Sequence, residues 1–75
     1  MDKTKLLSMI SEREREIVWH LAQGRTAKQI GYELNISPKT VITHRKNLKV
    51  KLKCKNCPQL IYKATRIGLV RNPYK

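Results

Sequence analysis

The chain has 75 residues, a formal net charge of +12 at pH 7 and a hydrophobic content of 40%. A chain this short forms one domain with a thin core, since such domains bury only about 60% of the surface of the unfolded chain, and it leaves little room for a catalytic cleft. No apolar run approaches the roughly 20 residues of a membrane span and no signal peptide is expected, so we predict a cytoplasmic protein with reduced cysteines.

The charge is distributed unevenly along the chain. All five acidic residues lie at or before residue 33, whereas residues 36–75 contain only basic charges. A segment whose charges are all positive attracts a polyanionic partner. The charge therefore favours nucleic acid as the partner, with an anionic membrane surface or an acidic protein as the alternative.

The first predicted helix begins after Ser11. Ser11 and Glu14 have the spacing of a capping box, in which each side chain satisfies a free backbone N–H of the first turn. Gly24 is placed to end the helix in a left-handed conformation. Residues 1–10 are expected to be an unstructured leader. The inward stripe at helical spacing is Ile17, Val18, Leu21 and Ala22.

A second, shorter helix is predicted between a capping Thr26 and Asn35, which tolerates a left-handed turn. Ile36 is expected to fill the turn that follows. Ser37 and Pro38 then begin a third helix, because Ser is a favoured N-cap and Pro suits the first helical position. The apolar positions of the second helix are Ala27, Ile30, Gly31 and Leu34.

The third predicted helix runs from Pro38 to about Lys53 and has two different faces. At 100° per residue, Val41, Leu48 and Leu52 point one way, and a buried, hydrogen-bonded His44 is expected at the border. The opposite face is polar and basic, which indicates a polar, anionic partner. Its residues are Lys39, Thr40, Ile42, Thr43, Lys46, Asn47 and Val50.

The last part of the chain predicts a loop, a fourth helix and a basic tail. The fourth helix begins at Pro58 and ends at Gly68, with Leu69 folding back as an apolar contact. The tail is residues 71–75. Cys54 and Cys57 lack the second pair of ligands that zinc requires, so we expect a small core residue and a helix-start residue, and no metal or cofactor.

The short helix, the turn and the longer basic helix together predict a helix-turn-helix over residues 26–47. The major groove of DNA is about 12 Å wide and admits one α-helix. In this motif the N-terminal residues of the second helix contact base edges, and the first helix lies against the backbone. An ordinary helical hairpin is the alternative, but it does not explain why the charge gathers on the second helix.

These segments resemble a known family. The stretches ISEREREIV, AKQIGYELNIS and KTVITHRKNLKVKL, with the spacing between them, are similar to the LuxR/GerE-type helix-turn-helix domain of bacterial transcription regulators, over most of the chain. The resemblance implies an all-α fold of four helices, specific binding of double-stranded DNA and a homodimer formed through the last helix. We expect residues 1–75 to be one such domain. The initiating Met and the leader favour a stand-alone GerE-like protein over an excised C-terminal domain.

The family pattern, together with the outward face, suggests roles for individual side chains. Base contacts are expected from Ile42, Thr43, Lys46 and Asn47, where Lys46 can donate to guanine and an aliphatic group can touch a thymine methyl. Phosphate contacts, which position a domain without specifying sequence, are expected from Thr26, Lys28, Lys39, Thr40, Arg45, Lys49 and Lys51. The dimer contacts are expected from Ile61, Tyr62 and Thr65.

Two other functions fit the same pattern of helices. One is a domain resembling the promoter-binding region of sigma factors, which would bind RNA polymerase. The other is a protein-interaction module of the same fold that binds another regulator, and its support is an exposed Trp19, His20 and Tyr62. An enzyme is not expected, because no nucleophile and base, and no pair of carboxylates, can be named.

Overall fold

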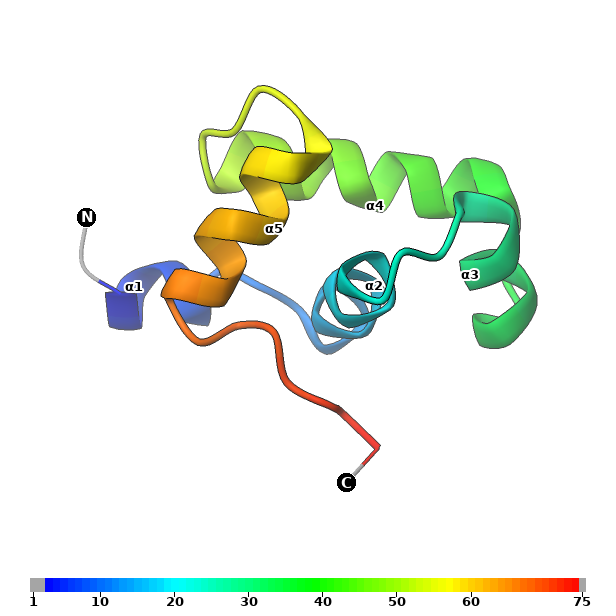
Figure 1. Ribbon diagram of the computed structural model, residues 1–75, viewed down its shortest axis with the longest axis horizontal. Coiled ribbons are helices and arrows are strands. Elements are labelled where there is room, and N and C mark those ends of the chain that lie inside the picture. The colour runs from blue at the N-terminus through cyan, green and yellow to red at the C-terminus, as the bar shows by residue number, and fades with distance from the viewer. Residues whose placement is uncertain (1–2, 75) are drawn as a thin grey trace.

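The computed structural model describes residues 3–74, in which the regular elements are all helices (Figure 1). The all-α class is therefore confirmed, with one helix more than the four expected. None of these helices is long and apolar enough to cross a membrane. The bounds are α1 Lys3–Ser8, α2 Glu12–Ala22, α3 Ala27–Leu34, α4 Pro38–Lys51 and α5 Cys57–Arg66.

Side-chain caps begin the two helices that precede α4. In α2 the N–H of Glu14 donates to Oγ of Ser11 at 3.1 Å, and the N–H of Ser11 donates to Oε1 of Glu14 at 2.9 Å. Thr26 and Gln29 exchange the same pair of bonds at the start of α3. Both boxes satisfy backbone donors that a helix leaves free at its first turn, so these starts are encoded locally.

The turn between α3 and α4 requires a residue without a side chain at Gly31. A Cβ there would lie 2.6 Å from the carbonyl oxygen of Ile36, and that oxygen belongs to backbone that cannot move aside cheaply. Asn35 takes the left-handed conformation, with φ 57°, and the N–H of Ile36 donates to the carbonyl of Gly31 at 2.9 Å. Ser37 caps α4 ahead of Pro38, as predicted.

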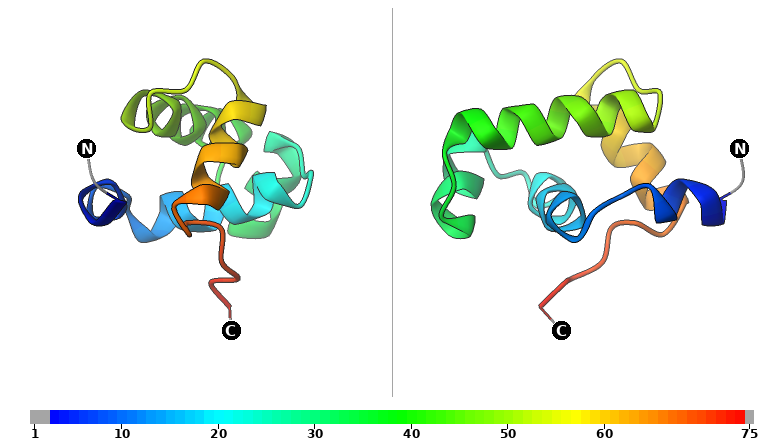
Figure 2. Two further views of the ribbon diagram at one scale, coloured as in Figure 1. Left: turned by 60° about the vertical axis from the view of Figure 1, so that its left-hand side comes forward. Right: turned by 180° about the vertical axis from the view of Figure 1, so that it is seen from behind.

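Each helix contributes apolar side chains from one of its faces to the core. The core residues with no exposed surface are Ile17, Val18, Ile30, Val41, Leu48, Leu52, Leu60 and Ala64. Because α4 packs on α2, α3 and α5 through these side chains, the opposite side of α4 is left at the surface of the molecule (Figures 1 and 2).

Three boundaries differ from the prediction, and the smallest difference is the start of α5, at Cys57 in place of Pro58. The leader is not unstructured, because residues 3–8 form α1, and Leu6 in this helix and Ile10 after it lie in the core. The third predicted helix ends at Lys51 and not at Lys53. Lys53 takes the left-handed conformation, with φ 56°, and the N–H of Cys54 donates to the carbonyl of Lys49 at 2.8 Å. A lysine here closes the helix as a glycine would, which propensity does not predict.

The C-terminal segment returns along α2. Gly68 has φ 77°, and the N–H of Leu69 donates to the carbonyl of Ala64 at 2.8 Å, which buries Leu69 as predicted. Residues 70–74 then run away from α4 and lie on the opposite side of the molecule from it in Figures 1 and 2. Within residues 69–74, the segment therefore adds no basic charge to the outward face of α4.

Candidate nucleic-acid interface

The outward face of α4 is a helical surface open to solvent. Ile42 is 45% exposed and Val50 72% exposed, whereas Val41 and Leu48 are fully buried. Lys39, Thr40, Thr43, Lys46 and Asn47 are exposed on the same side as Ile42 and Val50. The two faces predicted for this helix are confirmed.

The side chains expected to contact bases differ in whether they already make hydrogen bonds within the protein. Lys46 and Asn47 make no side-chain hydrogen bond or ion pair within residues 3–74. The Oγ1 of Thr43 donates to the carbonyl of Lys39 at 3.1 Å, which leaves its methyl group as the outward contact. The group therefore offers one ammonium, one amide and aliphatic surface from Ile42 and Thr43.

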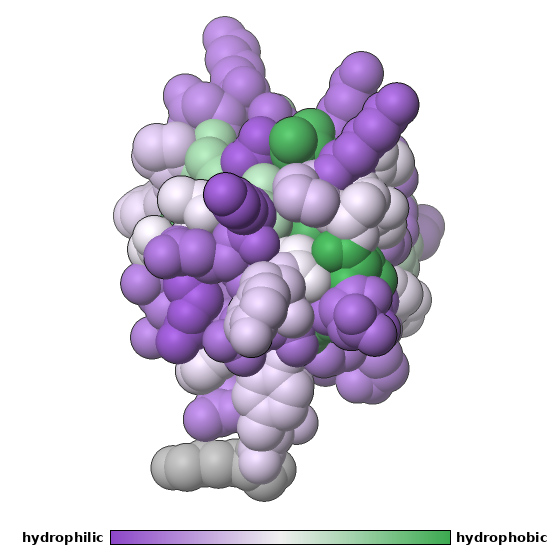
Figure 3. Space-filling view, turned by 90° about the vertical axis from the view of Figure 1, so that its right-hand side faces the viewer, coloured by the Kyte–Doolittle hydropathy of each residue, from purple (hydrophilic) through white to green (hydrophobic). Residues whose placement is uncertain are grey.

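The side chains expected to contact phosphates lie at the start of α3 and along α4. Lys28 and Lys39 are exposed, and Arg45 and Lys49 are half-buried. The hydroxyls of Thr26 and Thr40 both take part in helix caps, Thr40 through a 2.8 Å bond to Oγ of Ser37. Figure 3 looks onto α3 and the start of α4 and shows a mainly hydrophilic surface with small apolar areas.

Lys51 differs from the other lysines of α4. Its Nζ lies 2.8 and 3.0 Å from the carboxylate oxygens of Glu14 and donates to the carbonyl of Met9 at 3.1 Å. Burial raises the pKa of Glu14, but the hydrogen bonds from Lys51 and Ser11 outweigh it, and the pKa is lowered overall. Lys51 thus joins α4 to α2 and to the end of α1, and its ammonium is already occupied.

The predicted dimer contacts on α5 are partly exposed. Tyr62 is 64% exposed, Ile61 half-buried and Thr65 exposed. Arg66 donates to the hydroxyl of Tyr62 at 3.1 Å and its guanidinium lies 5.8 Å from the centre of the Tyr62 ring. A hollow of about 420 Å³ next to Tyr62 is partly lined by Cys54 and Ile67.

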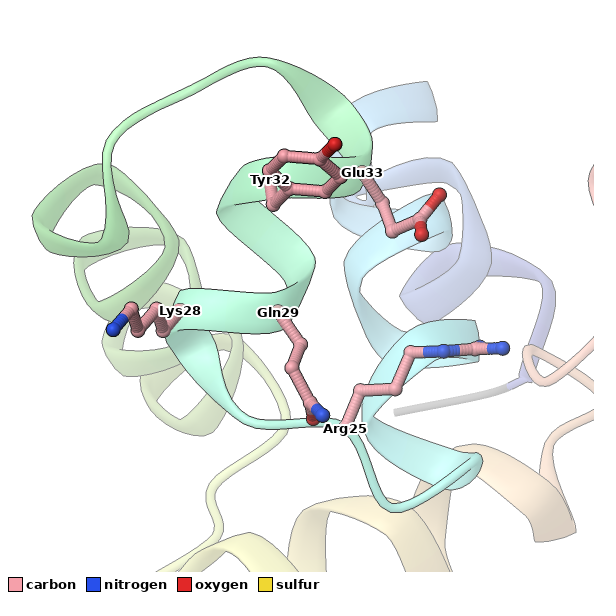
Figure 4. A pocket seen from close by; sticks show the side chains of 5 residues that line it. All are labelled: Arg25, Lys28, Gln29, Tyr32 and Glu33. Carbon is pink, nitrogen blue, oxygen red and sulfur yellow. The ribbon is translucent and has the colours of Figure 1, made fainter.

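A second hollow, of about 330 Å³, lies on the outer face of α3 and was not anticipated from the sequence. Tyr32, which is 87% exposed, stands over it. Figure 4 shows Lys28 and Arg25 pointing in opposite directions from its rim, with Arg25 lying toward α2. Since Glu33 also lines the hollow, it carries charges of both signs and no specific pattern for one ligand.

The expectation for His44 is wrong, and so is the exposure of Trp19 and His20 on which the protein-interaction alternative rested. His44 is half-buried and makes no hydrogen bond within residues 3–74. His20 is only 4% exposed, and Trp19 is half-buried against it at a ring distance of 5.0 Å. The exposed aromatic pair that supported a protein-interaction module is therefore absent, and only Tyr62 still supports that alternative.

The cysteines lie where the sequence indicated. Cys54 is half-buried against the core, and its Sγ is 3.4 Å from the carbonyl of Leu52. Cys57 is the first residue of α5. Within residues 3–74 no three His, Cys, Asp or Glu side chains come together in a way that would hold a metal ion.

Comparison with known proteins agrees with this arrangement. The family model "GerE: Bacterial regulatory proteins, luxR family" matches residues 8–64, which include α2, α3, the turn and α4. The chain belongs to the LuxR family of bacterial regulatory proteins. The match also covers the start of α5, so the family resemblance inferred from the sequence is confirmed.

Three similar proteins are transcriptional regulators by name. The chain is 43% identical over 62 residues to the transcriptional regulatory protein FixJ of Rhizobium meliloti, covering 83% of this chain and 30% of FixJ. It is 44% identical over 54 residues to the transcriptional regulatory protein UhpA of Salmonella typhimurium, covering 72% and 28%. For the transcriptional activator protein SolR of Ralstonia nicotianae the identity is 41% over 61 residues, covering 81% and 26%. The chain spans less than a third of the length of these relatives.

Proposed function

We propose that this LuxR-family chain is the DNA-binding domain of a transcription regulator and that α4 enters the major groove of double-stranded DNA. The observation that carries the proposal is the outward face of α4, where Ile42, Thr43 and Lys46 are exposed while Val41 and Leu48 hold the helix to the core. A helix exposed along one polar, basic side fits the groove. A regulator of this kind works in the cytoplasm.

The proposal assigns two sets of contacts. Ile42, Thr43, Lys46 and Asn47 contact base edges, and they carry the sequence preference. Phosphates are held by Thr26, Lys28, Lys39, Thr40, Arg45 and Lys49. Lys51, which the sequence placed among the phosphate contacts, is left out because Glu14 and Met9 already occupy its ammonium.

A homodimer through α5 completes the proposed function. One domain of this size makes few base contacts, and two domains related by two-fold symmetry contact two half-sites of an inverted repeat. The exposed surface of Tyr62 and Thr65, with the half-buried Ile61, supports α5 as the contact. The interface is small, so the free dimer is expected to be weak.

Selection of bound duplexes from a random pool tests the proposal. We expect a defined motif with two-fold symmetry, and binding that weakens with salt by a log–log slope of about −0.9 for each phosphate neutralised. If no duplex of any sequence is retained at low salt, the DNA-binding proposal is wrong. Capture of RNA polymerase or of another regulator by the same protein would then identify the alternative class of partner.

Replacing Lys46 tests the base contacts. We expect Lys46→Ala to cost about 1–3 kcal/mol of binding free energy on the selected duplex and to relax the preference at one position of each half-site. Affinity for the selected duplex, for its single-base variants and for random DNA is measured at one salt concentration. An equal loss on all of these duplexes would contradict a role in base recognition.

Replacing Lys28 tests the phosphate contacts. Lys28 is exposed at the start of α3 and has no partner within residues 3–74, so Lys28→Ala removes one charge with little effect on folding. We expect affinity to fall by a similar factor on selected and random duplexes, and the salt slope to fall by about 1. A loss confined to the selected sequence would show that Lys28 contacts bases instead.

A further inference from the structure

A polar cluster on α2 is not used by the proposed DNA contacts. Its centre is His20, which is 4% exposed. His20 Nδ1 lies 3.2 Å from the guanidinium of Arg25, its Nε2 lies 3.0 Å from the hydroxyl of Tyr74, and that hydroxyl lies 3.2 Å from Oε2 of Glu16. The cluster thus connects α2, the turn before α3 and the C-terminal segment.

The direction of each hydrogen bond follows from the groups involved. A guanidinium only donates, so Nδ1 of His20 must be the unprotonated, accepting nitrogen. In a neutral imidazole the proton is then on Nε2, which donates to the hydroxyl of Tyr74. That hydroxyl donates in turn to the carboxylate of Glu16. Each of these three hydrogen bonds then has one donor and one acceptor, and the series runs from Arg25 through His20 and Tyr74 to Glu16.

In this series of hydrogen bonds, only the one between Arg25 and His20 is incompatible with a protonated histidine. A proton on Nδ1 sets an N–H against the N–H of Arg25 across 3.2 Å and places two positive charges side by side. The Tyr74 end tolerates protonation, because Nε2 still donates. Burial and the charge of Arg25 lower the pKa of His20, whereas the charges of Glu33 and Glu16 act in the opposite direction.

We propose that His20 is a proton-controlled switch for Arg25: neutral His20 holds the guanidinium against α2, and protonated His20 releases it. Held Arg25 also lies over Trp19, 5.3 Å from the centre of the ring. Arg25 directly precedes the N-cap of α3, so its release frees a cation beside the first turn of that helix. The switch is a property of the folded chain and does not depend on DNA binding.

The test is an NMR titration of the histidine ring nitrogens of the full chain. At neutral pH we expect His20 to show an unprotonated Nδ1 and a protonated Nε2. We expect His20 to titrate with a midpoint below 6.5, and the fluorescence of Trp19, the one tryptophan of the sequence, to change with the same midpoint. A proton on Nδ1 at neutral pH, or a His20 midpoint at or above 6.5, would overturn the proposal.

Variants separate the switch from a histidine that is merely buried. In Arg25→Met the midpoint of the His20 titration should rise toward 6.5, since both the competing donor and the like charge are gone. An unchanged midpoint would refute the switch.

His44→Gln removes the other histidine and should leave the change in Trp19 fluorescence in place. Loss of that change in His44→Gln would assign it to His44. Tyr74→Phe, a milder change, should lower the midpoint of the His20 titration, because it removes an acceptor that the charged ring binds more tightly than the neutral ring does. A raised midpoint would contradict the hydrogen-bond order described above. Circular dichroism confirms that each variant is folded across the titration.

Discussion

Leu48→Ala is expected to remove about 2–5 kcal/mol from the free energy of unfolding, the usual range for a leucine deleted from a core. Leu48 is fully buried on the inward face of α4, where the core stripes of α2, α3 and α5 converge. Small proteins are stable by only about 5–15 kcal/mol in total, and a 75-residue chain is expected near the lower end. The variant should therefore be partly unfolded at 37 °C.

Val50→Ala is the matched control, because Val50 lies two residues further along the same helix and is 72% exposed. Its truncation should change the free energy of unfolding by less than about 0.5 kcal/mol, as surface substitutions usually do. Urea unfolding followed by circular dichroism measures both variants. Similar losses for Leu48→Ala and Val50→Ala would mean that α4 does not pack with the face described above, and the proposed groove-facing surface would be wrong as well.

The parts of the fold that the sequence predicted correctly are those with local causes. Ser11 with Glu14, and Ser37 with Pro38, mark helix starts whatever the rest of the chain does. Periodicity then separates Val41 from Ile42 on α4, so the exposed surface of the candidate site followed from the sequence. Thr26 and Gln29, three residues apart, carry the same local signal for the start of α3.

The parts that the sequence did not predict depend on contacts between distant segments. Nothing near Lys51 indicates that its ammonium binds Glu14, 37 positions earlier, and the lysine looked like any other basic residue of α4. Likewise Tyr74 is 54 positions from His20, and its return over α2 turned an apparently exposed histidine into a buried one. Residues 3–8 are too short to be recognised as a helix by periodicity, and packing of Leu6 on the core stabilises them.

Lys51→Met is expected to lower the free energy of unfolding by about 1.5–3 kcal/mol at neutral pH, the range for a lost hydrogen bond to a charged group. The reason is Glu14, which is 4% exposed and would remain as a buried carboxylate without its cation. The full cost of breaking a buried ion pair, about 3–5 kcal/mol, is not expected, because the side chain of Lys51 is 33% exposed. Lys49→Met, with a half-buried lysine and no partner within residues 3–74, is the control.

Acid unfolding tests the same ion pair independently. Because the pKa of Glu14 is lowered from its ordinary 4.5, its contribution to stability is present above pH 4.5 and is lost as the pH falls through the lowered pKa. In Lys51→Met, burial is no longer outweighed by the ammonium, so the pKa of Glu14 should rise, and the loss of stability between neutral and acidic pH should become smaller or reverse. Urea unfolding at a series of pH values between 3 and 7 measures this. If Lys51→Met and Lys49→Met lose the same amount of stability between pH 7 and pH 3, Lys51 does not hold Glu14 in solution and its ammonium is free to bind phosphate like the other lysines of α4.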